Sequence, residues 1–264
     1  MNQKTAVKRD VLGPGARLGL VARASIYLLI GVLSILVAAG HSTAETDQWG
    51  AMQQLNRSTL GHVLLWVVAL GLAGYALWRF SEAVFGVAGE GKKAGPRLKS
   101  FARGCVYTVI AFMAFEVAAG RGVRSQAGRQ ITLTAQVMRH TGGRVAVALV
   151  GAAVAVVGAI LVYEGATGKF EKYLDLSRAP AVTRRIVKII GVVGTVARGA
   201  LFALAGIFVI QAAWDYEPKK AAGLDGALRS LRDTAVGPWL LGVVALGLVA
   251  FGLYGLAEAR WRRT

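Results

Sequence analysis

The clearest pattern in the sequence is a long apolar segment that ends in a glutamate and occurs three times. The three copies cover residues 61–82, 143–164 and 237–258, and each begins with a glycine that lies 21 residues before its glutamate. At the helical rise of about 1.5 Å per residue, this spacing measures about 31 Å, close to the thickness of a bilayer's hydrocarbon core. Each copy is therefore predicted to be a membrane-spanning helix.

A second pattern opens the apolar runs that lie between these segments. An arginine flanked by small residues is followed four positions later by an aromatic residue, and it precedes the next segment's glycine by 38 to 40 residues. The two patterns alternate, which indicates three tandem helical hairpins. The motif pairs are Arg23 with Tyr27, Arg103 with Tyr107, and Arg198 with Phe202.

Together the two patterns predict an all-α polytopic membrane protein with six transmembrane helices, arranged as three tandem parallel helical hairpin repeats. We expect a single membrane domain over residues 1–264, with a basic cytoplasmic N-terminal tail at 1–15. The repeats are expected at about 16–86, 96–170 and 190–264. The spans are expected at about 18–40, 61–78, 104–120, 144–163, 189–213 and 237–257.

Composition supports a membrane protein and changes how the charge is interpreted. Hydrophobic residues make up 55% of the chain and charged residues 17%, whereas soluble domains have about 25% charged residues. The net charge of +17 is also typical of nucleic-acid-binding proteins, but the basic residues follow the connections between spans. This distribution favours an orientation signal facing anionic lipid, so we expect the lipid bilayer as partner and no nucleic acid.

The basic residues also predict the orientation of the chain. Both termini and the connections on their side carry 21 lysines and arginines, and the opposite connections carry 10. The side with more basic residues faces the cytoplasm, which places the N- and C-termini there. One outer connection, residues 121–144, has five arginines and no acid, and taken alone it would favour the opposite side.

The outer connections contain short apolar stripes before each return helix. In the third repeat the apolar residues recur at i, i+3, i+4 and i+7, which predicts a short amphipathic helix on the outer membrane surface. The first two repeats have fainter versions of the same stripe. The residues are Leu224, Ala227, Leu228 and Leu231, with Met52 and Leu55, and Leu133 and Val137, in the earlier repeats.

Charged residues at the inner ends of the spans are predicted to form a layer of ion pairs. The motif arginines and the terminal glutamates reach a similar depth, and pairing lowers the cost of holding charge in the bilayer. We expect pairing within repeats or across neighbouring ones. Such a layer would fix hairpin register; an ion or proton route through the carboxylates and independent snorkelling are the alternatives. The expected pairs are Arg23–Glu82, Arg103–Glu164 and Arg198–Glu258.

Two further polar residues interrupt the apolar runs without a threefold equivalent. Glu116 aligns with Leu36 and Gln211 when the repeats are superimposed by their offsets, so the position differs in each repeat. Glu116 lies about one turn from the outer end of its span, where its side chain is expected to snorkel. A lone carboxylate inside a membrane is nevertheless a candidate functional residue, and Gln211 shares that status.

Small residues are expected to mediate helix packing. Burial from water does not drive association in lipid, so close helix contact depends on small side chains. The even-numbered spans carry rows of them, which predicts inner contacts or a subunit interface along these helices. The residues are Gly71, Gly74, Gly151, Ala155, Ala159 and Gly247.

The sequence gives little sign of catalytic or metal chemistry. Cys105 is the single cysteine, so no intrachain disulfide is possible. His41, His62 and His140 lie near the outer face without the spacing of a metal site. Nucleophile motifs, Walker loops, dinucleotide fingerprints and HExxH helices are missing from the sequence, so we expect no enzyme, no metal and no cofactor.

The repeated motifs resemble those of a known family. One helix opens with Ala-Arg-[Gly/Ala]-x-x-[Tyr/Phe], and the next carries Gly-(x)9-Gly-Leu-x-x-[Tyr/Phe] over 61–75 and 237–251. Over nearly the whole chain this is similar to the bacterial membrane family named domain of unknown function 1206. The middle repeat departs from the pattern, with Ala153 and Val157 in place of glycine and the aromatic residue. The resemblance implies a bacterial plasma-membrane protein and supplies no activity or site residues.

Two classes of function remain open from the sequence. The expected charge pairs and short connections favour a structural or interaction protein, a scaffold-type bundle with a protein partner or a second copy of itself. Six spans in parallel repeats also occur in some carriers, so a small-solute or ion transporter or channel at the repeat interface is the alternative. A water-accessible cavity that reaches mid-membrane past a carboxylate would favour transport.

Overall fold

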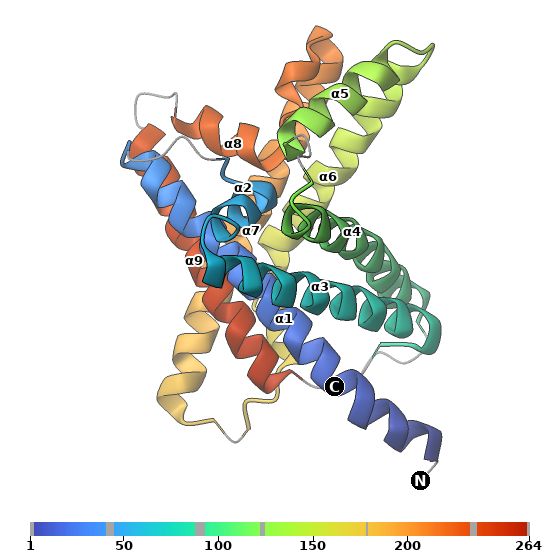
Figure 1. The fold of residues 1–264 in the computed structure, drawn as a ribbon, viewed down its shortest axis with the longest axis vertical. Coiled ribbons are helices and arrows are strands. Elements are labelled where there is room, and N and C mark those ends of the chain that lie inside the picture. Colours follow the sequence, from blue (N-terminus) through green and yellow to red (C-terminus); the bar gives the residue numbers. More distant parts are fainter. Residues whose placement is uncertain are drawn as a thin grey trace.

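A computed structural model describes residues 3–40, 45–87, 93–121, 125–177, 179–232 and 237–262. The predicted all-α polytopic fold is confirmed over these residues (Figure 1). Within them, six helices are long and apolar enough to cross a membrane, which identifies a multi-pass membrane protein. The long helices are α1 (Gln3–Ala38), α3 (Thr59–Phe85), α4 (Ala94–Ala118), α6 (Gly143–Ala166), α7 (Ala181–Asp215) and α9 (Gly237–Trp261).

Short helices occupy the connections. The connections predicted to be outer form α2 (Gln48–Leu55), α5 (Gln126–Met138) and α8 (Gly223–Arg232), at the positions of the predicted amphipathic stripes. Two 3₁₀ turns, η1 (Lys169–Tyr173) and η2 (Pro218–Lys220), complete the described elements. Both chain ends lie at the end of the molecule opposite to these three short helices (Figure 1).

Several helices begin earlier than their apolar runs. The backbone of α1 is helical from Gln3, so most of the predicted N-terminal tail is a helix that contains Pro14. The helices α4 and α7 begin at Ala94 and Ala181, eight to ten residues before the predicted spans. A helix can continue through polar residues outside its apolar run. The hydropathy pattern therefore locates the apolar part of each helix but not its first turn.

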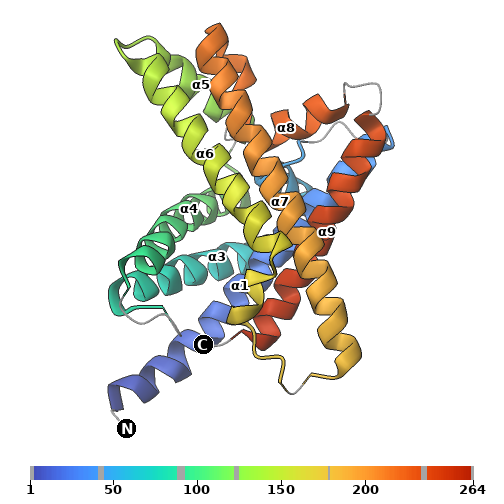
Figure 2. The ribbon, with the colours of Figure 1, turned by 180° about the vertical axis from the view of Figure 1, so that it is seen from behind.

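Each long helix packs most closely against a helix of another repeat. The closest pairs are α1 with α9, α3 with α4, and α6 with α7. Within repeats, α1 contacts α3 and α7 contacts α9, whereas α4 and α6 hardly approach each other. The six helices thus form a ring that is open between α4 and α6, and the pair α3–α4 crosses the other helices (Figures 1 and 2).

The closest of these pairs, α6–α7, is held by backbone contact between glycines. A Cβ atom placed on Gly158 would lie 2.2 Å from the backbone nitrogen of Ala203 and 2.7 Å from the carbonyl oxygen of Gly199. Gly206 is equally close to Gly151, whose carbonyl oxygen would lie 2.6 Å from an added Cβ. Lipid-embedded helices associate closely where such residues remove side chains from the interface.

The glycine row differs from the one predicted on α6. Gly151 and Ala155 face α7 as expected, but Ala159 is exposed and Gly158 takes its place in the contact. Four-residue steps rotate by about 40° per step around a helix, whereas seven-residue steps drift by only about 20°. The contacting glycines Gly151, Gly158 and Gly165 follow the seven-residue step.

The other predicted packing residues lie on two different contacts. Gly71 of α3 approaches α1, where an added Cβ would lie 2.9 Å from Cβ of Ala22. Gly247 of α9 approaches Ala197 of α7 in the same way, and Gly74 is half-buried in α3.

At the outer end, a buried hydrogen-bond cluster joins the first repeat to the third. The backbone nitrogen and hydroxyl of Thr46 donate to Oδ1 of Asp225 on α8, at 2.8 and 3.1 Å. Arg229 donates to the second oxygen of Asp225 at 2.8 Å. Asp47 accepts from the backbone nitrogen of Gly50 and caps α2. Burial raises the pKa of the Asp47 carboxyl to about 7, and burial also raises the pKa of Glu45.

The raised pKa of Asp47 predicts a pH-dependent outer cluster. The folded chain holds a proton that the unfolded chain releases, so the stability contributed by this site is complete below pH 3.8 and is lost as pH rises through about 7. The Asp47→Asn variant keeps the cap and should show a flatter profile. Amide hydrogen exchange of residues 46–55 from pH 4 to 8, corrected for intrinsic rates, measures this. Equal pH profiles in wild type and variant would contradict the assignment of the pH dependence to Asp47. The charged groups that face this cluster are Glu45, Asp225 and Arg229.

The glycine contact predicts a large difference between two adjacent substitutions on α6. Gly158→Leu would place a side chain inside the backbone of α7 and should lower the melting temperature strongly, by a destabilisation of about 2 kcal/mol or more. Ala159→Leu adds the same side chain on an exposed face and is the matched control. Thermal unfolding in detergent compares the two variants, and equal melting temperatures would contradict the packing described here.

Candidate functional site

An ion pair between α1 and α9, the first and the last of the long helices, begins a buried polar network that extends across the helices. Nη2 of Arg23 on α1 donates to Oε2 of Glu258 on α9 at 2.6 Å, and each side chain is only 8% exposed. Arg262, one turn beyond Glu258, donates to the other carboxylate oxygen. Both oxygens of this glutamate are therefore occupied by guanidinium groups.

The network continues onto α3 through a buried tyrosine. The hydroxyl of Tyr75 accepts hydrogen bonds from Nε of Arg79 at 2.9 Å and from Nη1 of Arg23 at 3.4 Å. Arg79 also donates to Glu82 at 2.7 Å, and the hydroxyl of Ser100 on α4 donates to the same carboxylate oxygen at 2.9 Å. One continuous chain of contacts thus joins α9, α1, α3 and α4. We call these seven residues the arginine network: Arg23, Tyr75, Arg79, Glu82, Ser100, Glu258 and Arg262.

Local sequence spacing explains how these side chains meet. Residues four apart on a helix lie on the same face, which aligns Tyr75 with Arg79 and Glu258 with Arg262. Small residues bring α1 and α9 together beside the ion pair, because a Cβ added to Gly255 would lie 2.9 Å from Cβ of Ala24. Arg23 can then reach across the contact to α9.

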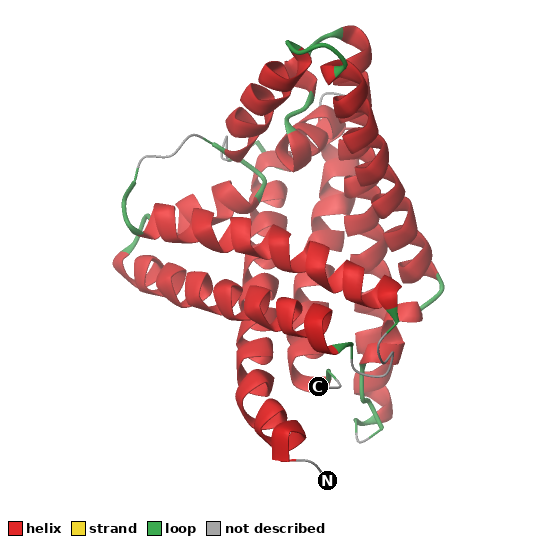
Figure 3. Cartoon of the chain, turned by 90° about the vertical axis from the view of Figure 1, so that its right-hand side faces the viewer, coloured by secondary structure: helices red, strands yellow, loops and turns green. Residues whose placement is uncertain are grey.

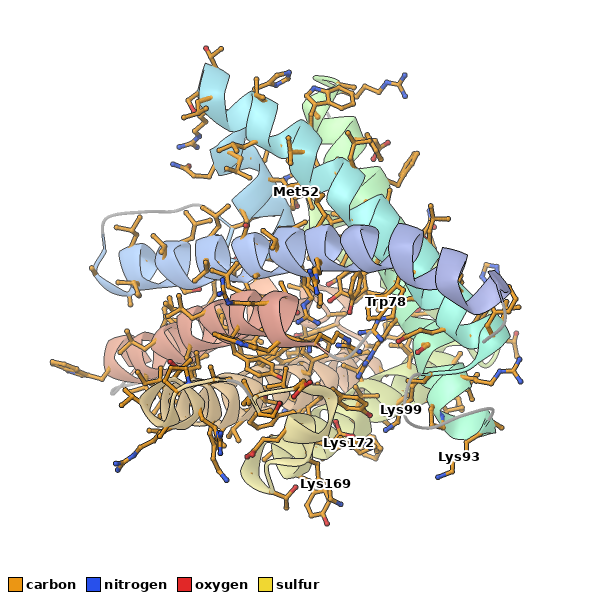
Figure 4. The ribbon with its side chains drawn as sticks, turned by 90° about the horizontal axis from the view of Figure 1, so that it is seen from below. Met52, Trp78, Lys93, Lys99, Lys169 and Lys172 are labelled. Atoms are coloured by element: carbon orange, nitrogen blue, oxygen red, sulfur yellow. The ribbon has the colours of Figure 1, made fainter. Side chains whose placement is uncertain are left out.

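Aromatic rings surround the charged groups. The guanidinium carbons of Arg79 and Arg262 lie 4.4 and 4.7 Å from the ring centre of Trp78, which is therefore close to two cations. Seen from below, side-chain nitrogens gather around Trp78 near the middle of the molecule (Figure 4). Such cation–π contacts stabilise guanidinium groups that have left water.

Over the described ranges, the three named ion pairs expected from the sequence are not formed, although pairing across repeats, which the sequence also allowed, does occur. The structure brings Arg23 to Glu258, while Arg198, the named partner of Glu258, is bonded to no glutamate among the described residues. Glu82 pairs with Arg79 of its own helix in place of Arg23.

The third glutamate also has a different partner. Glu164 of α6 pairs with Lys99 of α4 at 3.3 Å, and both side chains are substantially exposed, in place of the expected Arg103. The packing between repeats accounts for these differences, because it places α1 beside α9 as well as beside its own hairpin partner α3.

Two motif arginines remain outside the network. By the threefold pattern, Arg103 would pair with Glu82 and Arg198 with Glu164, but those carboxylates are bound to Arg79 and Lys99. Within the described chain, neither arginine has a carboxylate partner. Arg198 lies among aromatic rings, with ring-centre distances of 4.9 Å to Phe251, 5.4 Å to Tyr27 and 5.2 Å to Phe202.

Of the two residues expected to be lone polar groups, one has a partner. Glu116 accepts from Nη2 of Arg129 on α5 at 3.0 Å, so it links α4 to the outer connection rather than snorkelling alone. Gln211 is exposed near the outer end of α7. Glu116 therefore has a role in holding α5, which the sequence did not indicate because Arg129 lies in a different element.

The remaining candidate groups lie apart from the arginine network. Both ring nitrogens of His62 have a partner. Nδ1 lies 2.6 Å from Oδ1 of Asn56, and Nε2 accepts a hydrogen bond from the indole nitrogen of Trp66 at 3.2 Å. His140 lines an open pocket of about 570 Å³ at the turn between α5 and α6, and Cys105 is exposed. His41 lies outside the described residues. Among the described residues, no group of three or more His, Cys, Asp or Glu side chains could hold a metal ion.

The layer of inner-end charges has a clear electrostatic character. In the part of the chain that the structure describes, its carboxylates Glu82 and Glu258 are bound to arginines and Glu164 is bound to Lys99. The arginines of the layer outnumber these three carboxylates by two: they are Arg23, Arg79, Arg103, Arg198 and Arg262. A layer of this kind attracts anions and offers no free carboxylate to cations.

Sequence reasoning missed four members of the arginine network, and one of them, Ser100, was not singled out at all. Arg79 and Arg262 were counted only as basic residues near the inner surface, and Tyr75 only as a family motif residue. The available signal was helical spacing: Arg79 lies three residues before Glu82, and Arg262 four after Glu258. Charged residues at such spacing compete with partners on other helices.

Comparisons with known proteins agree with the repeat structure. A family model described as Domain of Unknown Function (DUF1206) matches the chain three times, at residues 18–86, 98–168 and 193–262. An uncharacterized protein of Bacillus subtilis (strain 168), YxxB, is 32% identical over 245 residues, which cover 92% of this chain and 88% of that protein. No solved structure matches the chain.

The buried ion pair predicts a strong coupling between its two residues. Arg23→Ala or Glu258→Ala alone leaves a charge in the bilayer without its partner and should destabilise the protein by about 3 kcal/mol. The double variant should lose much less than the sum. A double-mutant cycle measured by unfolding in detergent gives the coupling free energy. The exposed pair Lys99–Glu164 is the control, with an expected coupling below about 1 kcal/mol, and equal couplings for both pairs would contradict this description.

Proposed function

This chain belongs to the DUF1206 family, and from that premise we propose that it is a bacterial plasma-membrane protein with a structural or interaction role. The observation that carries the proposal is the engagement of both buried glutamates by arginines of the same chain. A carboxylate that is fully bound by guanidinium groups holds helices together and is poorly suited to pass protons or cations. We propose a non-catalytic role on the same grounds.

The proposed membrane placement has the termini in the cytoplasm. The side of the molecule that carries the chain ends has 21 of the 31 lysines and arginines of the sequence. Both ends lie on one side of the helices in the side view as well (Figure 3). The positive-inside rule then places the arginine network near the cytoplasmic surface and α2, α5 and α8 on the outer side.

The arrangement of the repeats supports a rigid bundle. The pairs α3–α4 and α6–α7 connect consecutive hairpins, and α1–α9 connects the first hairpin to the last. The arginine network joins four of the six long helices. The cross-repeat packing and the arginine network both restrict the movement of helices against one another, as a protein that positions a partner or a second copy requires.

Transport is the second candidate, and one observation favours it. The ring of helices is open between α4 and α6, where the exposed pair Lys99–Glu164 is the described ion pair that joins the two helices. Exposed pairs of this kind contribute at most about 1 kcal/mol, so α4 and α6 could separate at low cost.

Two measurements on the full chain distinguish the candidates. We expect proteoliposomes containing the protein to show no proton or potassium flux above empty liposomes, and photo-crosslinking in cells to recover one reproducible partner or a homodimer. A flux above that of empty liposomes that is abolished by Glu82→Gln, Glu258→Gln or Glu164→Gln would overturn the structural role in favour of transport.

The orientation has its own test. In a Cys105→Ser background, single cysteines are placed on the exposed Arg184 of α7 and on Lys219 of η2. The expected result is that a membrane-impermeant maleimide labels the Lys219→Cys variant in intact cells and labels the Arg184→Cys variant only after permeabilisation. The reverse pattern would invert the proposed topology.

A further inference from the structure

The two motif arginines outside the network carry positive charge that this chain does not neutralise. Arg103 and Arg198 have no carboxylate partner within the described residues, and the buried Nε of Arg198 makes no hydrogen bond. The Nε of Arg23, whose side chain is 8% exposed, also has no hydrogen-bond partner. Buried donors without acceptors are costly, and here they belong to cations near the membrane surface.

These arginines lie near one another although their helices do not touch. Tyr107, one turn after Arg103 on α4, packs its ring against that of Tyr75 with 4.6 Å between the ring centres, and the hydroxyl of Tyr75 accepts a hydrogen bond from Arg23. The helices α4 and α7, which carry Arg103 and Arg198, have almost no contact with each other. Arg103 is exposed on α4, next to the buried Gly104 that packs against α3. The segment of α4 that carries Arg103 is therefore joined to Arg23, whose guanidinium group lies over the same Phe251 ring as that of Arg198.

Aromatic rings fix the orientation of the guanidinium groups. The guanidinium carbons of Arg198 and Arg23 lie 4.9 and 5.5 Å from the ring centre of Phe251, so both groups contact the same ring. Tyr27 and Phe202 add two further rings around Arg198. A guanidinium held by rings on its faces keeps its N–H edge free to bind a planar or tetrahedral oxyanion.

We propose that Arg103 and Arg198, supported by Arg23, bind a phosphate-bearing anion that enters between α4 and the α6–α7 pair. Guanidinium forks match phosphate oxygens in geometry and form charge-assisted hydrogen bonds with them. The bound anion would supply the acceptors that these arginines lack and would reduce the repulsion between them. This site goes beyond the structural role proposed above, and it requires only that the helices span the membrane.

Two sources can supply this ligand chemistry. Arg103 lies nine residues after the first residue of α4, and the ring of helices is open to the bilayer between α4 and α6. An anionic phospholipid can therefore present its phosphate from the side. A soluble phosphate can approach the same groups from water at the inner surface.

The test measures phosphate and lipid binding by the full chain. Native mass spectrometry counts phosphatidylglycerol against phosphatidylcholine bound to protein released from a non-ionic detergent. Thermal unfolding in the same detergent compares sodium phosphate with sodium chloride at equal ionic strength. Loss of two charge-assisted contacts in Arg103→Gln/Arg198→Gln should weaken binding about 10-fold or more. The control is Arg184→Gln/Arg185→Gln, which removes the same charge from exposed positions on α7.

Each outcome decides the proposal. Preference for phosphatidylglycerol that only the Arg103/Arg198 variant loses supports the site and identifies a lipid headgroup. Stabilisation by phosphate that only this variant loses supports the site and identifies a soluble anion. No preference in the wild type, or equal losses in the control variant, overturns it. If the glutamine variant does not fold, Arg103→Lys/Arg198→Lys keeps the charges and should still bind several-fold more weakly, and unchanged binding there overturns the guanidinium assignment.

Discussion

A guanidinium group that leaves water must find partners inside the protein, and this constraint organises the inner half of the molecule. Arg23 meets it with Glu258, Tyr75 and the ring of Phe251, which come from two other helices. Arg79 meets it with Glu82, Tyr75 and Trp78. Because the two arginines share Tyr75, their requirements are satisfied together, and the helices that supply the partners are fixed relative to one another.

Glycine contacts make this arrangement possible, and several of them act between repeats. Ala24 and Gly255 bring α1 to α9, while Gly158 and Gly199 bring α6 to α7, and in both places a side chain would collide with the neighbouring helix. Since lipid gives apolar side chains no reason to leave it, close backbone approach and buried polar contacts supply the association. Other glycines act within repeats, since Gly71 brings α3 to α1 and Gly247 brings α9 to α7.

Much of the fold could be predicted from the sequence, because spans, repeats and short outer helices depend on local hydropathy. The motif arginines and terminal glutamates were located at the inner ends of the helices, but their partners were not. Glu82 could pair with Arg23 by repeat logic or with Arg79 by helical spacing, and the choice depends on which helices are in contact. The prediction that Ala159 packs against a neighbouring helix was wrong for a related reason, since the rotation of a helix against its neighbour is set by the whole interface. Long-range contacts of this kind leave no periodic trace in a single sequence.

The ion pair between Arg23 and Glu258 has a consequence for the biosynthesis of the protein. Its residues are 235 positions apart, on the first and last transmembrane helices. At roughly 5 to 20 residues per second, a ribosome needs on the order of ten seconds or more to synthesise the intervening chain. During that interval the nascent first hairpin holds an arginine whose carboxylate does not yet exist. Insertion of the final helix therefore completes the assembly. In a chain that stops before α9, Arg23 would have no Glu258 to pair with and would contact lipid or the insertion machinery instead.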